Sequence, residues 1–556
     1  MFFVLSRNIH SDISFNLHKS ATRYMDAGGI PASFLFCEME DFMSYINVNH
    51  LTFYYDGSAE NIFEDVSFRL DTDWKLGFIA RNGRGKTTFL NLLMGKYEYR
   101  GSISAEEPFH YFPFEATDLS KNPVDILESM YPDYEFWKVC RELSLLQVSE
   151  EVLFRPFSTL SNGERTKVML AVLFSMDNHF FLLDEPTNHL DMAARALLRD
   201  YLKSKKGFIL VSHDRDLLDA CIDHVLVINK TNIEVCQGNF STWWENKKRQ
   251  DAYEASEQAR LKKDIHRLKE AAAQAKTWAE EVESAKIGKR SEKYEWCKDS
   301  RAYIGEKSRR MQMRRKNLEQ RQEKEIAEKE GLLKNLETAE DLKLFPLRHY
   351  KSVLVEAKEL QISYGTTRLP AVSLVIESGD RIVLQGKNGC GKTSVIKVIL
   401  QALAENNGET PDAEPASEAR LFYEGTLKTA GGLKVSYVSQ ETRFLQGSLK
   451  VFVKRRDLEE TLFLTILRKL DFSREQFEKH MENYSEGQKK KVLLAASLCE
   501  KAHLYIWDEP LNFIDVFSRI QLEELILKWN PTLLFVEHDK AFVDKVATKV
   551  IEYREE

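Results

Sequence analysis

Cysteine is scarce in this chain, and its spacing forms no pattern of a known binding site. The seven cysteines include no Cys-x-x-Cys pair, and their number is odd. This argues against a disulfide framework and against a cysteine-ligated zinc site. The cysteine content therefore points to the reducing cytoplasm.

Long apolar runs are also missing. No stretch approaches the roughly 18 apolar residues that a membrane-spanning helix needs, so the sequence predicts no membrane domain. Hydrophobic residues still make up 43% of the 556 residues, which is enough to bury several cores in two to four domains. The net charge of −7 excludes a uniformly basic protein of the kind that coats nucleic acid.

The first segment of the chain lacks recognisable structure. Residues 1–42 have neither helical nor strand periodicity, and they lack the basic start and cleavage site of a signal peptide. An ordered pattern begins at Met43, and we hypothesise that translation starts there. The codons for Met39-Glu40-Asp41 could read ATG-GAG-GAT, a purine-rich ribosome-binding sequence. A disordered tail is the alternative, and mass spectrometry of the native N-terminus would separate the two.

Three short motifs occur twice in the same order. Arg-Asn-Gly-Arg-Gly-Lys-Thr-Thr at 81–88 recurs as Lys-Asn-Gly-Cys-Gly-Lys-Thr-Ser at 387–394, Asp-Glu-Pro at 184–186 recurs at 508–510, and His-Asp at 213–214 recurs at 538–539. The chain is therefore a tandem repeat. In each copy apolar runs alternate with helical stretches, which is typical of α/β folds. Strands are predicted at 75–80, 179–183, 207–211, 381–385, 504–507 and 532–536.

The segment between the copies has a different composition. Residues 247–340 contain no proline and are rich in Ala, Glu, Lys, Arg and Gln, which predicts two long helices at about 247–290 and 306–340. The predicted organisation is an N-terminal extension at 1–42, a first domain at 43–246, a helical linker at 247–345 and a second domain at 346–556. The linker is basic, since 285–316 alone carries 12 basic and 4 acidic residues.

The glycine-rich motifs are suited to binding nucleotide phosphates. A strand, a glycine-rich loop and a Lys-Thr pair that opens a helix direct backbone N–H groups and the helix dipole at an anion. Lys86 and Lys392 are expected to reach the β- and γ-phosphates of ATP, and Thr87 and Thr393 to bind Mg²⁺. The second loop has the full pattern from Gly386, whereas the first has Ala80 in place of the leading glycine.

The acidic pairs follow apolar strands, which places them beside the phosphate loops. Asp184 and Asp508 would hold Mg²⁺ through water, and Glu185 and Glu509 would orient or deprotonate the attacking water. Two histidines at matched positions could contact the γ-phosphate. The predicted catalytic residues are Glu185, Glu509, His213 and His538.

Two further segments precede basic helical stretches. Leu-Ser-Asn-Gly-Glu at 160–164 and Tyr-Ser-Glu-Gly-Gln at 484–488 resemble the signature of ATP-binding cassette proteins, Leu-Ser-Gly-Gly-Gln/Glu. In that family the signature closes over the γ-phosphate of the opposite cassette, and an upstream aromatic stacks on adenine. A helix N-cap at Ser161 and Ser485 is compatible with this role, whereas Tyr55 and Tyr364 could equally be core residues.

The resemblance predicts the fold and the ligand contacts. The fold would be α/β, with two tandem nucleotide-binding domains of the P-loop NTPase type joined by a long helical hairpin. The expected contacts to ATP in the first copy are Tyr55, Asn82, Gly83, Gly85, Lys86, Thr87, Thr88, Ser161, Gly163 and Asp184. Those in the second are Tyr364, Gly386, Asn388, Gly389, Gly391, Lys392, Thr393, Ser394, Gln440, Ser485, Gly487 and Asp508. The expected Mg²⁺ ligands are Thr87, Asp184, Thr393, Gln440 and Asp508.

The two copies differ where the family places a glutamine between the loop and the signature. Gln440 fits that position in the second copy, but Phe114 occupies it in the first. Because phenylalanine coordinates neither Mg²⁺ nor water, we predict that the two sites hydrolyse ATP at unequal rates. Glu185→Gln and Glu509→Gln should then slow hydrolysis to different extents.

Most tandem cassettes power transporters, but tandem cassettes with no membrane domain and with a long charged linker resemble the F group of ATP-binding cassette proteins over residues 43–556. These are bacterial translation factors and antibiotic-resistance factors that bind the ribosomal E site and extend the linker toward the peptidyl transferase centre. The motifs at 63–68, 73–79, 81–93 and 111–114 are similar to the Lsa-type ribosomal protection proteins. That resemblance implies resistance to lincosamides, pleuromutilins and streptogramin A.

The linker has residues suited to RNA. Basic side chains would contact phosphates, and interleaved aromatics could stack on bases; Tyr303 is our best candidate for the residue nearest the drug. The arm residues singled out are Lys298, Arg301, Tyr303, Arg309 and Arg310. The expected partners are ribosomal RNA and P-site tRNA but not DNA, and the chain would act as a monomer with an intramolecular cassette dimer. A solvated coiled coil is the alternative for the linker.

Tandem cassettes also occur in proteins with three other functions. A housekeeping translation regulator of the same group would share the cassettes, typically with a shorter arm. A soluble ATPase subunit of a transporter would need a membrane partner. A DNA-repair cassette protein would need a much longer coiled coil or zinc-binding cysteines, which the sequence lacks.

Overall fold

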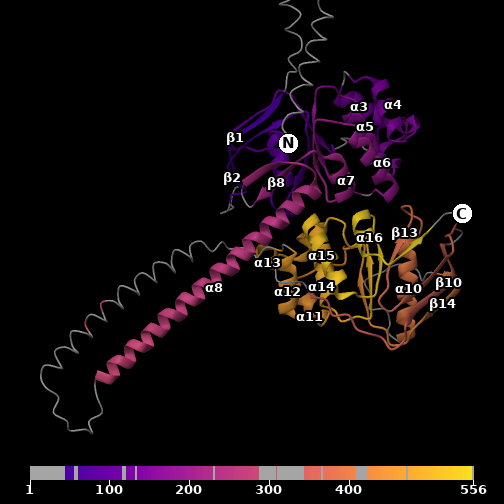
Figure 1. Ribbon diagram of the computed structural model, residues 1–556. Helices are drawn as coiled ribbons and strands as arrows, with labels where there is room; N and C mark the ends of the chain where they lie inside the picture. Colours follow the sequence, from indigo (N-terminus) through magenta and orange to yellow (C-terminus); the bar gives the residue numbers. More distant parts are fainter. Residues whose placement is uncertain are drawn as a thin grey trace, which may run out of the picture.

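A computed structural model gives the three-dimensional structure of the chain. It describes residues 44–55, 61–114, 120–131, 134–188, 190–229, 232–286, 309, 313, 343–364, 367–407, 422–470, 472 and 474–553. The predicted extension at 1–42 and the proposed start at Met43 lie outside the described residues. The structure comprises two α/β units and a long helix that projects away from both (Figure 1).

The first unit is built on a six-stranded sheet. Five strands are parallel and β9 at the edge is antiparallel. The strand order is β5 (Phe109–Phe112), β6 (Phe180–Asp184), β7 (Phe208–Val211), β3 (Lys75–Ile79), β8 (His224–Asn229) and β9 (Asn232–Gln237). A second, antiparallel sheet has the order β2 (Phe63–Asp71), β1 (Tyr45–Phe53) and β4 (Arg100–Ser104).

The second unit repeats this plan. Its main sheet has five parallel strands in the order β15 (Val435–Val438), β16 (Leu504–Asp508), β17 (Leu533–Val536), β13 (Arg381–Gln385) and β18 (Lys549–Glu552). The antiparallel sheet contains β10 (Val353–Tyr364), β11 (Thr367–Arg368), β12 (Val372–Glu377) and β14 (Phe422–Thr429). In both units an antiparallel layer thus accompanies the parallel sheet.

Helices pack around these sheets. The first unit contains α2 (Lys86–Leu93), α3 (Pro123–Met130), α4 (Phe136–Leu145), α5 (Asn162–Leu173), α6 (Met192–Lys203) and α7 (Arg215–Cys221). The second contains α10 (Lys392–Asn407), α11 (Leu449–Arg455), α12 (Glu460–Lys469), α13 (Arg474–Glu478), α14 (Glu486–Cys499), α15 (Val516–Trp529) and α16 (Lys540–Val546). None of the helices in the described ranges has the length and apolar character needed to cross a membrane.

The six strands predicted from apolar runs are confirmed to within one residue at each end. These runs are recognisable because the strands are buried on both faces of a parallel sheet, which leaves no polar alternation. In β7 and β17, for example, every residue is buried.

The first linker helix begins earlier than predicted. Helix α8 spans Phe240–Lys286, so it starts seven residues before the predicted 247 and inside the predicted first domain. The change of composition at Lys247 therefore marks where the helix leaves the unit rather than where it begins. Its first residue, Phe240, packs into the core of the first unit, where it is only 2% exposed. The predicted second helix at 306–340 lies outside the described residues, apart from the helical positions 309 and 313.

The two units pack directly on each other. Val516 and Ile520 at the start of α15 belong to a hydrophobic cluster that otherwise comes from the first unit and the root of α8. The Arg215 guanidinium donates two hydrogen bonds to the fully buried carboxylate of Glu523 in the second unit. An apolar contact and a bidentate ion pair therefore fix how the units meet.

Candidate functional site

The two glycine-rich loops hold their lysines in the same way. The Lys86 ammonium donates to the carbonyl oxygen of Ala80 at 2.8 Å and to Asn82 Oδ1 at 3.1 Å. The Lys392 ammonium donates to the carbonyl oxygens of Gly386 at 2.9 Å and Lys387 at 2.7 Å. Since Ala80 supplies the same carbonyl as Gly386, the substitution of the leading glycine leaves this arrangement intact.

The loop backbones have the geometry of a phosphate cradle. Gly83, Gly85, Gly389 and Gly391 all have positive φ, between 81° and 107°. Such loops turn successive backbone N–H groups toward an anion. Each loop ends at the first residue of a helix, α2 or α10, so the positive end of a helix dipole faces the same point.

The first acidic residue of each pair lies at the end of a central strand, beside its loop. Thr87 Oγ1 donates to Asp184 Oδ2 at 3.1 Å, and the Tyr111 hydroxyl donates to the same oxygen at 2.9 Å. Asp508 is fully buried, and the Thr393 side chain beside its carboxylate opposes a rise in its pKa. Burial, and after it the negative charge of Glu509, raises the pKa of Asp508 to about 6. A buried carboxylate fits a divalent cation, because oxygen ligands are those that Mg²⁺ prefers.

The second acidic residue of each pair is held in an unusual conformation beside a histidine. Glu185 and Glu509 have φ of 51° and 47°, in a region that residues other than glycine rarely adopt and that is often found at functional sites. His213 Nε2 lies 3.3 Å from Glu185 Oε1, and His538 Nε2 lies 3.7 Å from Glu509 Oε1. Burial and the nearby Lys86 hold the pKa of His213 well below its usual range, so this histidine is neutral.

The two glutamates differ in charge state. Burial, and after it the neighbouring Asp184, raises the pKa of Glu185 to about 7. Burial acts the same way on Glu509, but His538 and the Gln440 amide outweigh it and lower the pKa of Glu509 below its usual value. Gln440 Nε2 donates to Glu509 Oε2 at 2.9 Å, and Asn512 Nδ2 donates to the same oxygen at 2.6 Å.

Phe114 accounts for part of this difference. In the first unit it occupies the position of Gln440, and its ring packs against the hydrophobic core. It lines a small apolar cavity together with Phe157, Tyr131 and neighbouring aliphatic residues. Phe114 therefore supplies no amide to Glu185, and the two sites are chemically unequal.

The signature segments cap helices, and one of them meets the opposite loop. Ser161 caps α5 and Ser485 caps α14, each in a reciprocal capping box with the residue three positions later. A Cβ on Gly487 would lie 2.8 Å from the carbonyl oxygen of Phe513. That carbonyl accepts a hydrogen bond from Asn82 Nδ2 in the first unit at 3.0 Å. The second signature is thus brought next to the first phosphate loop.

Charged residues of the second unit that the sequence analysis does not name lie beside the contact between Phe513 and the first phosphate loop. Asp515 caps α15 and pairs with the buried Lys491 at 3.2 Å. Its charge and that of Glu185 oppose the burial that lowers the pKa of Lys86, so the second unit contributes to the electrostatics of the first loop. The recurrence of Asp515 as Asp191, at the same spacing after both Asp-Glu-Pro motifs, is a signal that could have identified it.

Of the two aromatic residues expected to stack on adenine, the structure describes the side chain of one. The Tyr55 hydroxyl forms a hydrogen bond with Thr88 Oγ1 at 2.9 Å, and its ring is 41% exposed beside the first loop. Tyr364 ends strand β10, but its side chain is not described. Of the arm residues only Arg309 is described, at an exposed helical position; Lys298, Arg301, Tyr303 and Arg310 lie outside the described residues.

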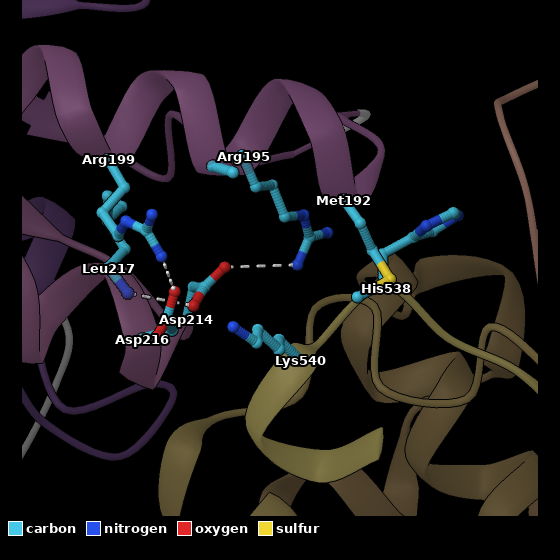
Figure 2. Close-up of a pocket in the computed structure, with 9 residues that line it drawn as sticks. Met192, Arg195, Arg199, Asp214, Asp216, Leu217, His538 and Lys540 are labelled. Carbon is cyan, nitrogen blue, oxygen red and sulfur yellow. Dashed lines mark hydrogen bonds and ion pairs between the residues drawn. The ribbon is translucent and has the colours of Figure 1, made fainter. Parts of the chain in front are cut away.

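A separate cavity of about 120 Å³ lies where α6 and α7 meet the start of α16 (Figure 2). Arg195 pairs with Asp214 at 3.5 Å, and Arg199 pairs with Asp216 at 2.9 Å. Lys540 enters from the second unit. The cavity thus lies at the seam between the units, and His538, which neighbours Glu509, is among the residues that line it.

Comparison with known families identifies the units. A family model described as ABC transporter matches residues 63–188 and 369–512, one stretch in each unit. The chain carries two ATP-binding cassettes. Both are ATPase domains, and domains of this kind bind ATP, generally with Mg²⁺. The matched stretches contain the phosphate loops and the acidic pairs described above.

Several relatives align with both cassettes. The ribosome protection protein VmlR of Bacillus subtilis is 26% identical over 513 residues, which is 91% of this chain and 86% of the relative. The ATP-binding protein Uup of Buchnera aphidicola is 24% identical over 91% of this chain and 80% of its own length. Among solved structures, an archaeal ribosome recycling factor crystallised with a ribosomal stalk protein has a TM-score of 0.55 and 19% identity, covering 91% of this chain and 88% of its own. That likeness supports the tandem cassette fold.

Proposed function

We propose that this protein is an ATP-driven ribosome-binding factor of the F group that protects the ribosome from antibiotics acting at the peptidyl transferase centre. The observation that carries the proposal is helix α8, a 47-residue helix that projects from the pair of cassettes. None of the helices in the described residues could span a membrane. The similarity to VmlR, which is named as a ribosome protection protein and aligns with 91% of this chain, supports it.

In this proposal the arm enters from the ribosomal E site and dislodges the drug, in contact with ribosomal RNA and P-site tRNA. The protein acts in the cytoplasm as a monomer. The contact between the first phosphate loop and the second signature supports an ATP site built within one chain. ATP would favour the closed arrangement of the cassettes, and hydrolysis would release the protein from the ribosome.

The residues of each cassette would divide the work of hydrolysis. Lys86 and Lys392 would bind the phosphates, with Mg²⁺ held by Thr87, Asp184, Thr393, Gln440 and Asp508, where it would neutralise charge that develops on the phosphoryl oxygens. Glu185 and Glu509 would take the proton of the attacking water. His213 and His538 would orient these glutamates and contact the γ-phosphate. The ionised Glu509 would make the second cassette the faster of the two near neutral pH.

Phe114 also supports a finer assignment to the Lsa-type proteins. It lies in Tyr-Phe-Pro-Phe, one of four motifs shared with that group, and its ring packs into the core in place of the amide that Gln440 supplies. The proposed drug classes are accordingly lincosamides, pleuromutilins and streptogramin A.

Ribosome binding can be tested with a variant that binds ATP without turning it over. The Glu185→Gln/Glu509→Gln protein should sediment with ribosomes in the presence of ATP and stay in the supernatant without nucleotide. Recovery of a membrane protein in place of ribosomes in a pull-down would favour a transporter subunit instead.

Drug protection requires a second experiment. Cells that express the wild-type protein should tolerate a pleuromutilin better than cells that express Tyr303→Ala, while both proteins keep the same ATPase rate. Ribosome binding with no change in drug tolerance for either protein would indicate a housekeeping translation factor.

A further inference from the structure

The root of the arm helix touches both cassettes. Phe240 in the first turn of α8 is buried in the first cassette. The next turn presents Trp243 and Trp244, whose rings lie 6.1 Å and 5.7 Å from the ring of Phe517 on α15 of the second cassette. Aromatic rings at such distances attract each other beyond the area they bury. Three aromatic residues therefore join the arm to the cassette that does not carry it.

The same turn of α15 lies against the first ATP site. The Arg81 guanidinium, at the start of the first phosphate loop, lies 5.9 Å from the centre of the Phe517 ring. Phe513, just before this helix, accepts the hydrogen bond from Asn82 of the same loop. Phe517 is thus placed between the loop that binds ATP and the helix that forms the arm.

The repeat allows this position to be compared with its counterpart. Asp191 and Asp515 cap equivalent helices, so Phe517 corresponds to Ala193 on α6. The helix that meets α8 therefore carries a phenylalanine where its counterpart carries alanine. The difference also indicates that alanine is compatible with this position of the helix.

We propose that Trp243, Trp244 and Phe517 form an aromatic latch that positions the arm helix α8 when ATP draws the second cassette onto the first phosphate loop. Separation of the cassettes breaks the contact of both tryptophans with Phe517 and leaves α8 anchored to the first cassette alone. Closure adds a second point of attachment and fixes the direction of the arm. The latch rests on the ATP-driven closure in the proposed function but not on the ribosome or the drug.

Distance measurements between spin labels on the purified full-length protein can test the latch. Labels introduced through non-natural amino acids avoid the native cysteines. One pair, at Glu257 on α8 and Glu478 on α13, reports the arm relative to the second cassette. The other pair, at Glu150 and Glu478, reports closure of the cassettes. These three positions are exposed, and the Glu185→Gln/Glu509→Gln background keeps ATP intact.

With ATP, both label pairs should give single narrow distance distributions. Phe517→Ala should at least double the width of the arm distribution and leave the closure distance unchanged. Trp244→Ala should have the same effect, and the double variant should add nothing further if the two rings act through each other. Phe154→Ala is a matched control because Phe154 forms an exposed aromatic pair with Phe136 at 6.3 Å, away from the arm.

The latch is overturned if the arm distribution stays narrow in both single variants. It is also overturned if the variants lose the closure distance itself, since the rings would then serve closure rather than arm position. If ATP does not shorten the distance between the labels at Glu150 and Glu478 in the Glu185→Gln/Glu509→Gln protein, ATP does not close the cassettes and the latch is refuted with it. Because no ribosome is present, a negative result for ribosome binding would leave these outcomes unaffected.

Discussion

The unequal charge states of the two glutamates predict unequal dependence of hydrolysis on pH. Each glutamate can be isolated by replacing the other with glutamine. In Glu509→Gln the remaining base is Glu185, whose pKa is raised to about 7. A carboxylate accepts a proton only when it is ionised, so activity is present above this pKa and is lost as the pH falls through it. Between about pH 8 and about pH 6 the ionised fraction, and with it kcat/KM, should fall about tenfold.

The reciprocal variant should behave differently. In Glu185→Gln the remaining base is Glu509, whose pKa lies below its usual value of 4.5. Its kcat/KM should therefore change little over the same range. The matched test replaces Gln440, whose amide donates to Glu509 at 2.9 Å. A hydrogen bond to a charged group contributes about 1.5–3 kcal/mol, which corresponds to about one to two pKa units.

The variant Gln440→Leu in the Glu185→Gln background should accordingly lose activity at a higher pH than its parent. The measurement is a profile of kcat/KM for ATP from steady-state phosphate release, because this quantity reports the pKa values of the free enzyme. The reasoning is refuted if the two single-glutamine variants share one midpoint, or if Gln440→Leu lowers the rate equally at every pH.

Two substitutions test packing within the second cassette, beside the first phosphate loop, and pairing between the cassettes. In Gly487→Ala the added Cβ would lie 2.8 Å from a backbone carbonyl, so we expect a loss of about 1–3 kcal/mol and a lower melting temperature in calorimetry. Gly163→Ala, whose Cβ would lie 3.6 Å from a leucine side chain, should melt as the wild type does, and equal melting of both variants would contradict the packing argument. Arg215→Met removes the bidentate partner of the buried Glu523 and leaves it paired with Lys545 alone, so denaturant unfolding should show a loss of about 2 kcal/mol. Lys248→Met, which removes an exposed pair with Glu524 and the contact of the ammonium with the Trp244 ring, should cost about 1 kcal/mol at most, and an equal cost for the two would argue against the buried pair.

Much of the fold was predictable because its signals are local. The central strands are uninterrupted apolar runs, and both phosphate loops require glycines at fixed spacing before a helix. The capping boxes of Ser161 and Ser485 are likewise contained within four residues. Composition does not mark the start of α8, because Phe240 belongs to the helix by backbone geometry and to the first cassette by packing.

Residue types and spacing predict which side chains lie beside the two phosphate loops, but they do not predict the charge distribution there. The sequence predicts unequal sites from Phe114 and Gln440, but the pKa values of Glu185 and Glu509 depend on burial and on neighbouring side chains. The effect of Asp515 on the pKa of Lys86 is likewise not predictable from the sequence, because the two residues belong to different cassettes. Such contacts join residues more than 400 positions apart along the chain, as between Asn82 and Phe513.

The sequence by itself determined that this chain has two ATP-binding cassettes, that they are unequal at Phe114 and Gln440, and that a charged helix leaves the first of them. Those properties depend on residue type and short-range spacing, which the chain carries before it folds. Tertiary structure alone decided that the second signature meets the first phosphate loop and that Phe517 meets the root of α8. These depend on which surfaces two folded units bury against each other, a choice fixed by shape and desolvation over the whole interface.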